Sequence, residues 1–123
     1  MRLLLDTPVA LWWDEGAPLA QPAVDAIVGA DQVFVSAVSA WELEAKAAAG
    51  RVRSKRTLAD VIRDGGFEEL PLTVAHCRQL ASLPRQHRDP FDRLLIAQAM
   101  AEDLMLVTRN AVLSAYRVRT VWA

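Results

Sequence analysis

Three acidic side chains and one amide stand where separate parts of the chain can bring them together. Asp6 ends a short apolar run, and Asn110 follows a later one. Glu42 and Asp92 each border the apolar face of a segment with helical spacing. Clustered carboxylates with no obvious basic partner repel one another, and a divalent cation relieves that repulsion. Oxygen ligands of this kind suit Mg²⁺ or Mn²⁺ rather than zinc.

Each of these residues also has an ordinary structural explanation. Asp6 suits a turn between a strand and a helix, and Asn110 is a good helix N-cap. Glu42 can complete a capping box with Ser39, or it can form an ion pair with Lys46 one helical turn later. Taken one residue at a time, the sequence leaves both explanations open.

Two acids lie close together at the start of one predicted helix. Asp89 precedes Pro90, and proline favours the first helical position, so Asp89 is interpreted as the structural N-cap. Asp92 then falls in the first turn, where the helix dipole favours a negative charge. Because Asp92 shares a face with Leu95, it also borders the packed side of the helix. We interpret Asp92 as the functional member of the pair.

The elements that must position these residues alternate between short apolar runs and helical patterns. Strands are expected at residues 3–5, 33–35, 67–70, 104–107 and 118–121. Helices are expected at residues 8–15 with Thr7 as N-cap, 21–29, 36–49, 57–64, 73–83 with Thr73 as N-cap, and 89–102, with a helical turn at 110–115. This pattern predicts an α/β fold: a three-layer α/β/α sandwich with a mostly parallel central sheet. Ligands bind such sheets beyond the carboxyl ends of the strands, where Asp6 and Asn110 are expected.

Length and composition bound the class of protein. The 123 residues suit a single domain over 1–123, and an apolar share of 53% excludes a disordered chain. The one cysteine, Cys77, cannot form an internal disulfide. No apolar run approaches the roughly 20 residues of a membrane span, and Asp6 interrupts any signal-peptide core. We therefore expect a cytoplasmic protein.

The charge balance argues against nucleic-acid binding through bulk charge. The chain has 14 basic and 15 acidic residues, for a net charge of −1. Local basic clusters are the candidates for contact with a polyanion: Arg51, Arg53, Lys55, Arg56 and Arg63 in one stretch, Arg85, Arg88 and Arg93 in a second, and Arg109 alone. For the first stretch, an ordinary solvated loop is the more common explanation.

Several apolar and aromatic residues also carry expectations. Trp12 and Trp13 are adjacent, so they lie about 100° apart on a helix and only one of them faces the core squarely. The other indicates either an interface with another chain or a tryptophan lying along the surface. Trp41 is assigned to the inward face of its helix. Cys77 is expected in the core and His76 at its margin.

Four motifs in order along the chain carry a family resemblance. They are RLLLDT (residues 2–7), SAVSAWE (36–42), DPFDRLLIAQA (89–99) and LVTRN (106–110). In this order they resemble a PIN domain, and more closely a VapC-type ribonuclease toxin of a type II toxin–antitoxin system. The resemblance covers essentially the whole chain, and its third motif is the most specific.

The resemblance implies an endoribonuclease that depends on Mg²⁺ or Mn²⁺. By position, the family's metal ligands correspond to Asp6, Glu42, Asp92 and Asn110, and the three acids are the catalytic candidates. A metal-activated water would attack an RNA phosphodiester, with Asp92 or Glu42 orienting the water. The implied partners are an RNA substrate, a cognate antitoxin protein and a second copy in a homodimer. Trp12 or Trp13 would then lie at the homodimer seam or in the antitoxin groove.

Two positions depart from the family pattern. Family members commonly carry Asp where this chain has Asn110, which removes one negative charge from the expected metal site. Close relatives often have a His where this chain has Pro8. The first departure keeps an alternative open: a non-catalytic PIN module that binds RNA or antitoxin without cutting.

Overall fold

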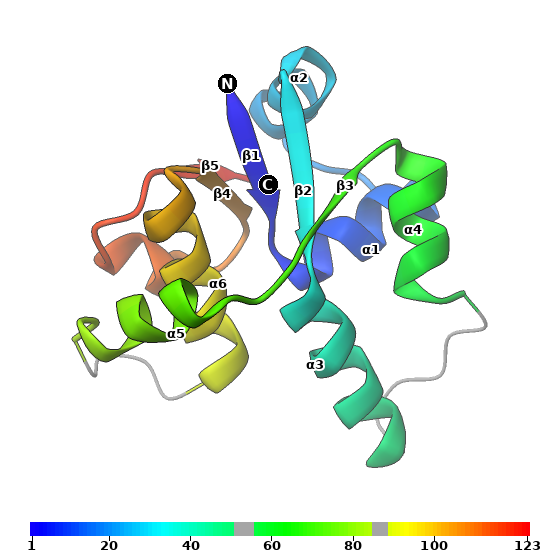
Figure 1. Ribbon diagram of the computed structural model, residues 1–123. Coiled ribbons are helices and arrows are strands. Elements are labelled where there is room, and N and C mark those ends of the chain that lie inside the picture. The colour runs from blue at the N-terminus through cyan, green and yellow to red at the C-terminus, as the bar shows by residue number, and fades with distance from the viewer. Residues whose placement is uncertain (51–55, 85–88) are drawn as a thin grey trace.

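The computed structural model describes residues 1–50, 56–84 and 89–123 (Figure 1). Five of the basic residues considered for polyanion contact lie outside the described residues: Arg51, Arg53, Lys55, Arg85 and Arg88. Within the described part of the chain, no helix is both long enough and apolar enough to cross a membrane.

A five-stranded parallel sheet forms the centre of the fold. Its strands are β1 (Arg2–Leu5), β2 (Gln32–Ser36), β3 (Glu68–Leu70), β4 (Met105–Thr108) and β5 (Thr120–Trp122), in the order β3-β2-β1-β4-β5. Every adjacent pair is parallel, and Leu4 lies opposite both Phe34 and Leu106. The predicted parallel sheet is confirmed. Since strand order reverses beside β1, the carboxyl ends of β1 and β4 flank a switch point, where open α/β sheets bind ligands.

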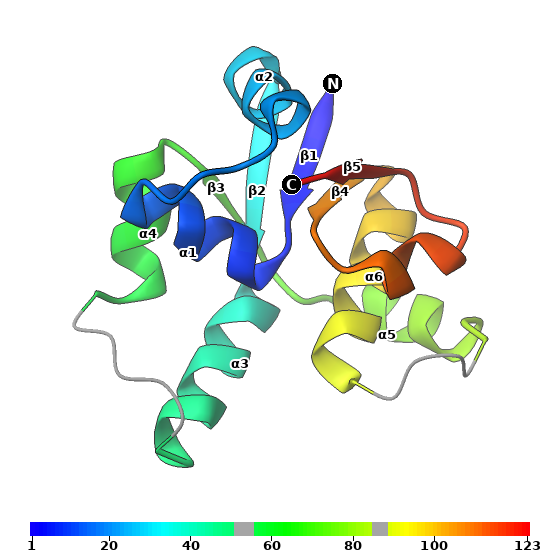
Figure 2. The same cartoon turned by 180° about the vertical axis from the view of Figure 1, so that it is seen from behind.

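Helices cover both faces of the sheet, so the predicted three-layer sandwich is confirmed (Figures 1 and 2). They are α1 (Thr7–Glu15), α2 (Gln21–Gly29), α3 (Ala37–Ala48), α4 (Leu58–Gly65), α5 (Val74–Ala81), α6 (Pro90–Glu102) and a 3₁₀ turn, η1 (Ala111–Ala115). Leu3 and Leu5 pack with α1, α2 and α4, whereas Leu4 packs with α6 on the opposite face. All three leucines are fully buried, which contributes about 2 kcal/mol each. This one run therefore anchors both layers and fixes where Asp6 emerges.

Two of the helix caps expected from the sequence are confirmed: Thr73 caps α5 and Asp89 caps α6. The N-cap of α1 is Asp6 rather than Thr7, and the Asp6 carboxylate accepts a hydrogen bond from the Thr7 backbone N–H at 2.9 Å. The prediction was wrong because Asp and Thr are both good caps and stand side by side here.

Trp41 does not lie in the core. It is 53% exposed, because α3 turns its Val38 and Glu42 side toward the fold. The Trp41 ring instead meets the ring of Phe91 edge-on, with 4.8 Å between the centroids. An apolar contact between α3 and α6 thus replaces the predicted core position.

The positions expected of His76 and Cys77 are both wrong. Cys77 is exposed, and His76 is completely buried. The His76 ring bonds at both nitrogens: Nε2 lies 2.8 Å from Glu102 Oε1, and Nδ1 accepts a hydrogen bond from the Thr73 backbone N–H at 3.1 Å. A buried histidine needs such partners, and here they come from the N-cap of α5 and the last residue of α6.

Candidate functional site

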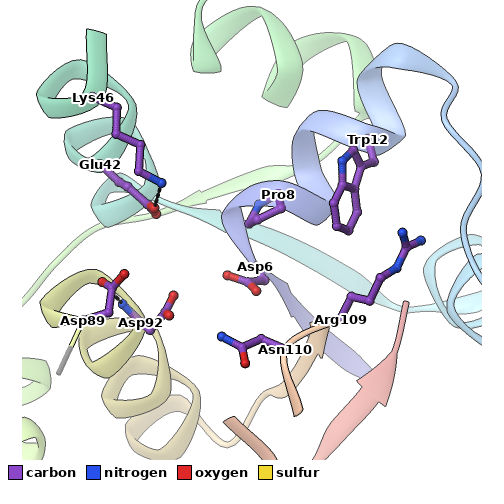
Figure 3. Close-up of a pocket in the computed structure, with 9 residues that line it drawn as sticks. All are labelled: Asp6, Pro8, Trp12, Glu42, Lys46, Asp89, Asp92, Arg109 and Asn110. Carbon is purple, nitrogen blue, oxygen red and sulfur yellow. Dashed lines mark hydrogen bonds and ion pairs between the residues drawn. The ribbon is translucent and has the colours of Figure 1, made fainter. Parts of the chain in front are cut away.

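A pocket of about 300 Å³ lies where β1 and β4 end (Figure 3). Parts of α1, α3 and α6 form the rest of its wall. The residues that line it are Asp6, Pro8, Trp12, Glu42, Lys46, Asp89, Asp92, Arg109 and Asn110. The fold therefore brings all four candidate site residues to one pocket.

Asp6 is held rigidly at the end of β1. Its side chain is buried, with one carboxylate oxygen accepting from the Thr7 backbone N–H and the other from the Thr108 hydroxyl at 2.8 Å. The Thr108 hydroxyl in turn accepts a hydrogen bond from the Asn110 backbone N–H at 3.0 Å. This chain of bonds links the ends of β1 and β4, so the position of Asp6 is set by both strands.

Burial raises the pKa of Asp6 from its ordinary value of 3.8 to about 6. The hydrogen bonds from Thr108 and Thr7 favour the charged form and offset part of this effect. The negative charges of Asp92 and Glu42 raise the pKa further. The carboxylates of the pocket therefore repel one another, which is the condition that a cation relieves.

Glu42 is buried, but only one of its two carboxylate oxygens has a hydrogen-bond partner. Oε2 lies 2.6 Å from the ammonium of Lys46, whereas Oε1 is buried without a hydrogen-bond partner. The ion pair with Lys46 expected from the spacing is confirmed. A buried carboxylate oxygen without a partner costs stability, so this oxygen is suited to a ligand.

The capping box from Ser39 to Glu42, the other structural explanation considered for Glu42, is not formed. Helix α3 is capped by Ser36, whose hydroxyl accepts from the Val38 backbone N–H at 2.9 Å. Ser39 lies inside the helix, and its hydroxyl is 2.7 Å from that of Thr7. Ser39 therefore ties α3 to the start of α1 and leaves Glu42 facing the pocket.

Asp89 and Asp92 divide their roles at the start of α6. The Asp89 carboxylate accepts from the backbone N–H groups of Phe91 at 2.9 Å and Asp92 at 3.2 Å, which confirms it as the cap. The side chain of Asp92 is half-buried and lines the pocket, on the side facing Asp6 in Figure 3. Asp89 also lines the pocket, and its Oδ1 accepts both of these backbone hydrogen bonds.

Asn110 serves as a cap while facing the pocket. Its Oδ1 accepts a hydrogen bond from the Val112 backbone N–H at 3.1 Å and so begins η1. The structural explanation given by the sequence is thus confirmed. The side chain nevertheless lies beside Asp6 (Figure 3).

The donors fit a hard divalent cation by their chemistry. Carboxylate and amide oxygens surround one pocket, and one oxygen of Glu42 has no partner. In the described ranges, no group of three or more His, Cys, Asp or Glu side chains lies close enough together to hold a metal ion. Coordination by three of these residues therefore requires their side chains to move closer together.

Sequence reasoning assigned Arg109 to a polyanion but did not anticipate its role in the wall of the pocket. Its guanidinium donates to the carbonyl oxygens of Pro18 at 3.1 Å and Ala123 at 2.8 Å. It also lies over the Trp12 ring, 4.3 Å from the centroid. Trp12 thereby becomes part of the site, whereas Trp13 packs against Phe67 with 6.4 Å between the ring centroids.

Neighbouring groups occupy the described members of the two basic stretches. Arg56 forms ion pairs with Asp14 at 2.7 Å and Asp64 at 2.6 Å, and Arg63 pairs with Asp60 and Asp64. Arg93 donates to the Pro84 carbonyl at 3.0 Å. Arg56 and Arg63 therefore offer less net charge to a polyanion than the sequence suggests.

Two comparisons with known proteins match nearly the whole chain. The PIN domain family matches residues 3–118. Ribonuclease VapC22 of Mycobacterium tuberculosis is 33% identical over 132 aligned positions, which cover 98% of each chain.

Solved structures share the fold at low sequence identity. The crystal structure of VapBC2 from Rickettsia felis, bound to a DNA fragment from its promoter, gives a TM-score of 0.71 at 14% identity and covers 99% of this chain and 98% of that chain. The DNA-bound VapBC of Salmonella typhimurium gives a TM-score of 0.70 at 17% identity, with the same coverage of both chains.

Proposed function

Because the chain belongs to the PIN domain family, we propose that it is a Mg²⁺- or Mn²⁺-dependent endoribonuclease, the toxin of a bacterial toxin–antitoxin pair. One observation carries this proposal: four carboxylates line a pocket at the switch point of the sheet, and one of them, that of Glu42, keeps a buried oxygen without a partner. The 33% identity to a ribonuclease over nearly the whole chain supports the choice of RNA as substrate.

The residues divide the work as follows. Asp6, Glu42 and Asp92 would hold the cation, with the Asn110 amide as a fourth oxygen donor. Such an ion, when bound, activates water and stabilises charge on the phosphodiester. Asp6 is fixed by its bonds to Thr7 and Thr108, so it serves to position. Glu42 keeps one carboxylate oxygen without a partner, and Asp92 lines the same pocket, so these two are the groups to orient the attacking water and accept its proton.

We further propose that an antitoxin covers this pocket and that the toxin acts in the cytoplasm as a homodimer. Two of the solved structures that share the fold are complexes of the VapBC type. Trp12 lines the pocket and Trp41 is exposed beside Glu42, so both offer aromatic surface to a covering segment. Size-exclusion chromatography with light scattering, with and without the antitoxin, tests the assembly.

Removal of divalent ions is expected to abolish RNA cleavage. Without a cation, the carboxylates repel both one another and the phosphate backbone. The measurement is cleavage of total RNA and tRNA by antitoxin-free protein in EDTA, and after addition of Mg²⁺ or of Mn²⁺. Cleavage that persists in EDTA would contradict the metal-dependent mechanism. RNA that is bound but never cut in any ion would instead establish the non-catalytic binding module.

An Asn110→Asp variant is expected to bind Mn²⁺ about 10-fold more tightly, because ligand charge count tunes the affinity of such sites. An aspartate at this position can still accept the hydrogen bond from the Val112 N–H, so the start of η1 is preserved. Isothermal titration of both proteins with Mn²⁺ measures the difference. Equal affinities would show that the side chain at this position caps η1 and does not reach the ion.

A further inference from the structure

The ammonium group of Lys46 is built into the wall of the pocket. Lys46 lies one turn after Glu42 on α3, with Nζ 2.6 Å from Glu42 Oε2 (Figure 3). Its side chain is 36% exposed, whereas that of Glu42 is 5% exposed. The ion pair therefore runs from the buried wall of the pocket toward solvent, and the positive end lies on the open side.

Lys46 is one of two positively charged side chains among the described residues of a pocket whose charged lining is mostly acidic. Four carboxylates line it, and the described part of the chain supplies two cations, Lys46 and Arg109. The guanidinium of Arg109 is fixed by the Pro18 and Ala123 carbonyls and by the Trp12 ring. Lys46 has three donors, and its hydrogen bond to Glu42 uses one of them. Lys46 therefore keeps two donors for a ligand.

An ordinary ion pair within a helix does not explain why the Glu42 carboxylate is buried with one oxygen unpartnered. An ordinary pair four residues apart is exposed and contributes little to stability. Here the carboxylate is buried, and Lys46 meets only one of its two oxygens. The other oxygen stays without a partner, which is unfavourable unless a second group binds there. The arrangement places Glu42 between a cation on one side and the pocket on the other.

We propose that Lys46 binds a phosphate of the RNA substrate at the mouth of this pocket. A polyanion that enters a pocket lined by four carboxylates needs a compensating positive charge, and a lysine ammonium supplies it as a point charge. The same ammonium neutralises Glu42 when no other cation is present. This role rests on the proposed ribonuclease function, and it assigns to Lys46 a contact with substrate in addition to its ion pair with Glu42.

The test compares wild type with Lys46→Met, which keeps the length of the side chain without its charge, and with Lys46→Arg, which keeps the charge. Binding of a fluorescent single-stranded RNA is measured by anisotropy in Ca²⁺ at several salt concentrations, and gels verify that the RNA stays intact. We expect Lys46→Met to weaken RNA binding about 10-fold and to lower the salt slope by about one, as loss of one phosphate contact does. Lys46→Arg is expected to bind nearly as tightly as wild type.

A second measurement separates this role from that of a structural ion pair. Titration with Mn²⁺ in the absence of RNA is expected to show tighter binding by Lys46→Met, because Glu42 then has no competing cation. In Lys46→Met, the affinity for RNA is thus expected to fall while the affinity for Mn²⁺ rises. Unchanged RNA affinity and salt slope in Lys46→Met would overturn the proposal. A wild type that binds RNA without cutting it would overturn the nuclease function alone, and one that binds no RNA would overturn both.

Discussion

An Asp92→Asn variant is expected to lose RNA cleavage by more than about 100-fold while it keeps its fold, because changes even one step removed from a metal ligand typically cost 10- to 100-fold. Asp92 lies in the first turn of α6 and lines the pocket. Asparagine has nearly the same shape, and its backbone N–H still reaches the Asp89 carboxylate. We expect the free energy of unfolding to change by less than about 1 kcal/mol, since lost helix-dipole stabilisation is offset by weaker repulsion of Asp6.

The same variant has an electrostatic signature that does not require activity. The charge of Asp92 raises the pKa of Asp6, so its removal is expected to lower that pKa. Titration of the Asp6 carboxyl carbon by NMR in metal-free protein measures this change. A pKa that does not move would show that the two side chains lie too far apart to share a cation.

Asp103→Asn is the matched control for Asp92→Asn. Asp103 follows the other end of the same helix, is exposed, and pairs with Arg119 at 3.0 Å on the surface. Its backbone is left-handed, with φ of 54°, which asparagine tolerates. The same chemical change is therefore expected to leave cleavage at the wild-type rate. If Asp92→Asn also cleaves at the wild-type rate, Asp92 takes no part in the reaction.

The layered fold and the meeting of the four site residues were predictable from sequence. Strands buried on both faces read as continuous apolar runs, as Leu3–Leu5 do, and that pattern depends on no distant residue. Parallel strands then carry the residues that follow them to one edge of the sheet. The place of Asp6 beside Asn110 follows from these two facts.

Side-chain partners across the fold were not predictable in the same way. Arg56 lies in a basic stretch, but Asp14, its partner, is 42 residues away in the sequence and meets it only after α1 and the start of α4 pack. The burial of His76 likewise depends on Glu102 of another helix. Trp41 was assigned to the core because it belongs to an apolar helical stripe. Such a stripe does not show which of its residues the rest of the fold covers, and Trp41 is left exposed. Local patterns carry no information on such contacts.

An Asp6→Asn variant is expected to lose cleavage. Without metal it is also expected to be more stable than wild type, with a free energy of unfolding up to about 3 kcal/mol larger at about pH 7.5. The gain follows from the pKa of Asp6, which lies at about 6 in the folded protein instead of 3.8. Each unit of that shift corresponds to about 1.4 kcal/mol. A buried amide removes the charge and can still accept the bond from the Thr7 N–H.

The sign follows from proton binding. Because the pKa is higher in the folded state, the folded wild type holds this proton more tightly than the unfolded chain. Below about pH 3 both states are protonated, and Asp6 costs no stability. As pH rises from about 4 to about 6, the unfolded chain releases the proton before the folded protein does, so the free energy of unfolding of the wild type falls. The advantage of Asp6→Asn is therefore expected to be near zero below about pH 3 and complete above about pH 7.

Urea denaturation of both proteins in EDTA at several pH values measures this advantage, and the contributions of other carboxylates cancel in the difference. An advantage independent of pH would contradict the raised pKa. In Mn²⁺ the order is expected to reverse, because an ion that binds only the folded wild type stabilises it by mass action. A buried aspartate that destabilises the metal-free fold and stabilises the metal-bound one is retained for binding the ion. If Mn²⁺ stabilises both proteins equally, Asp6 is not a ligand, and its burial needs another explanation.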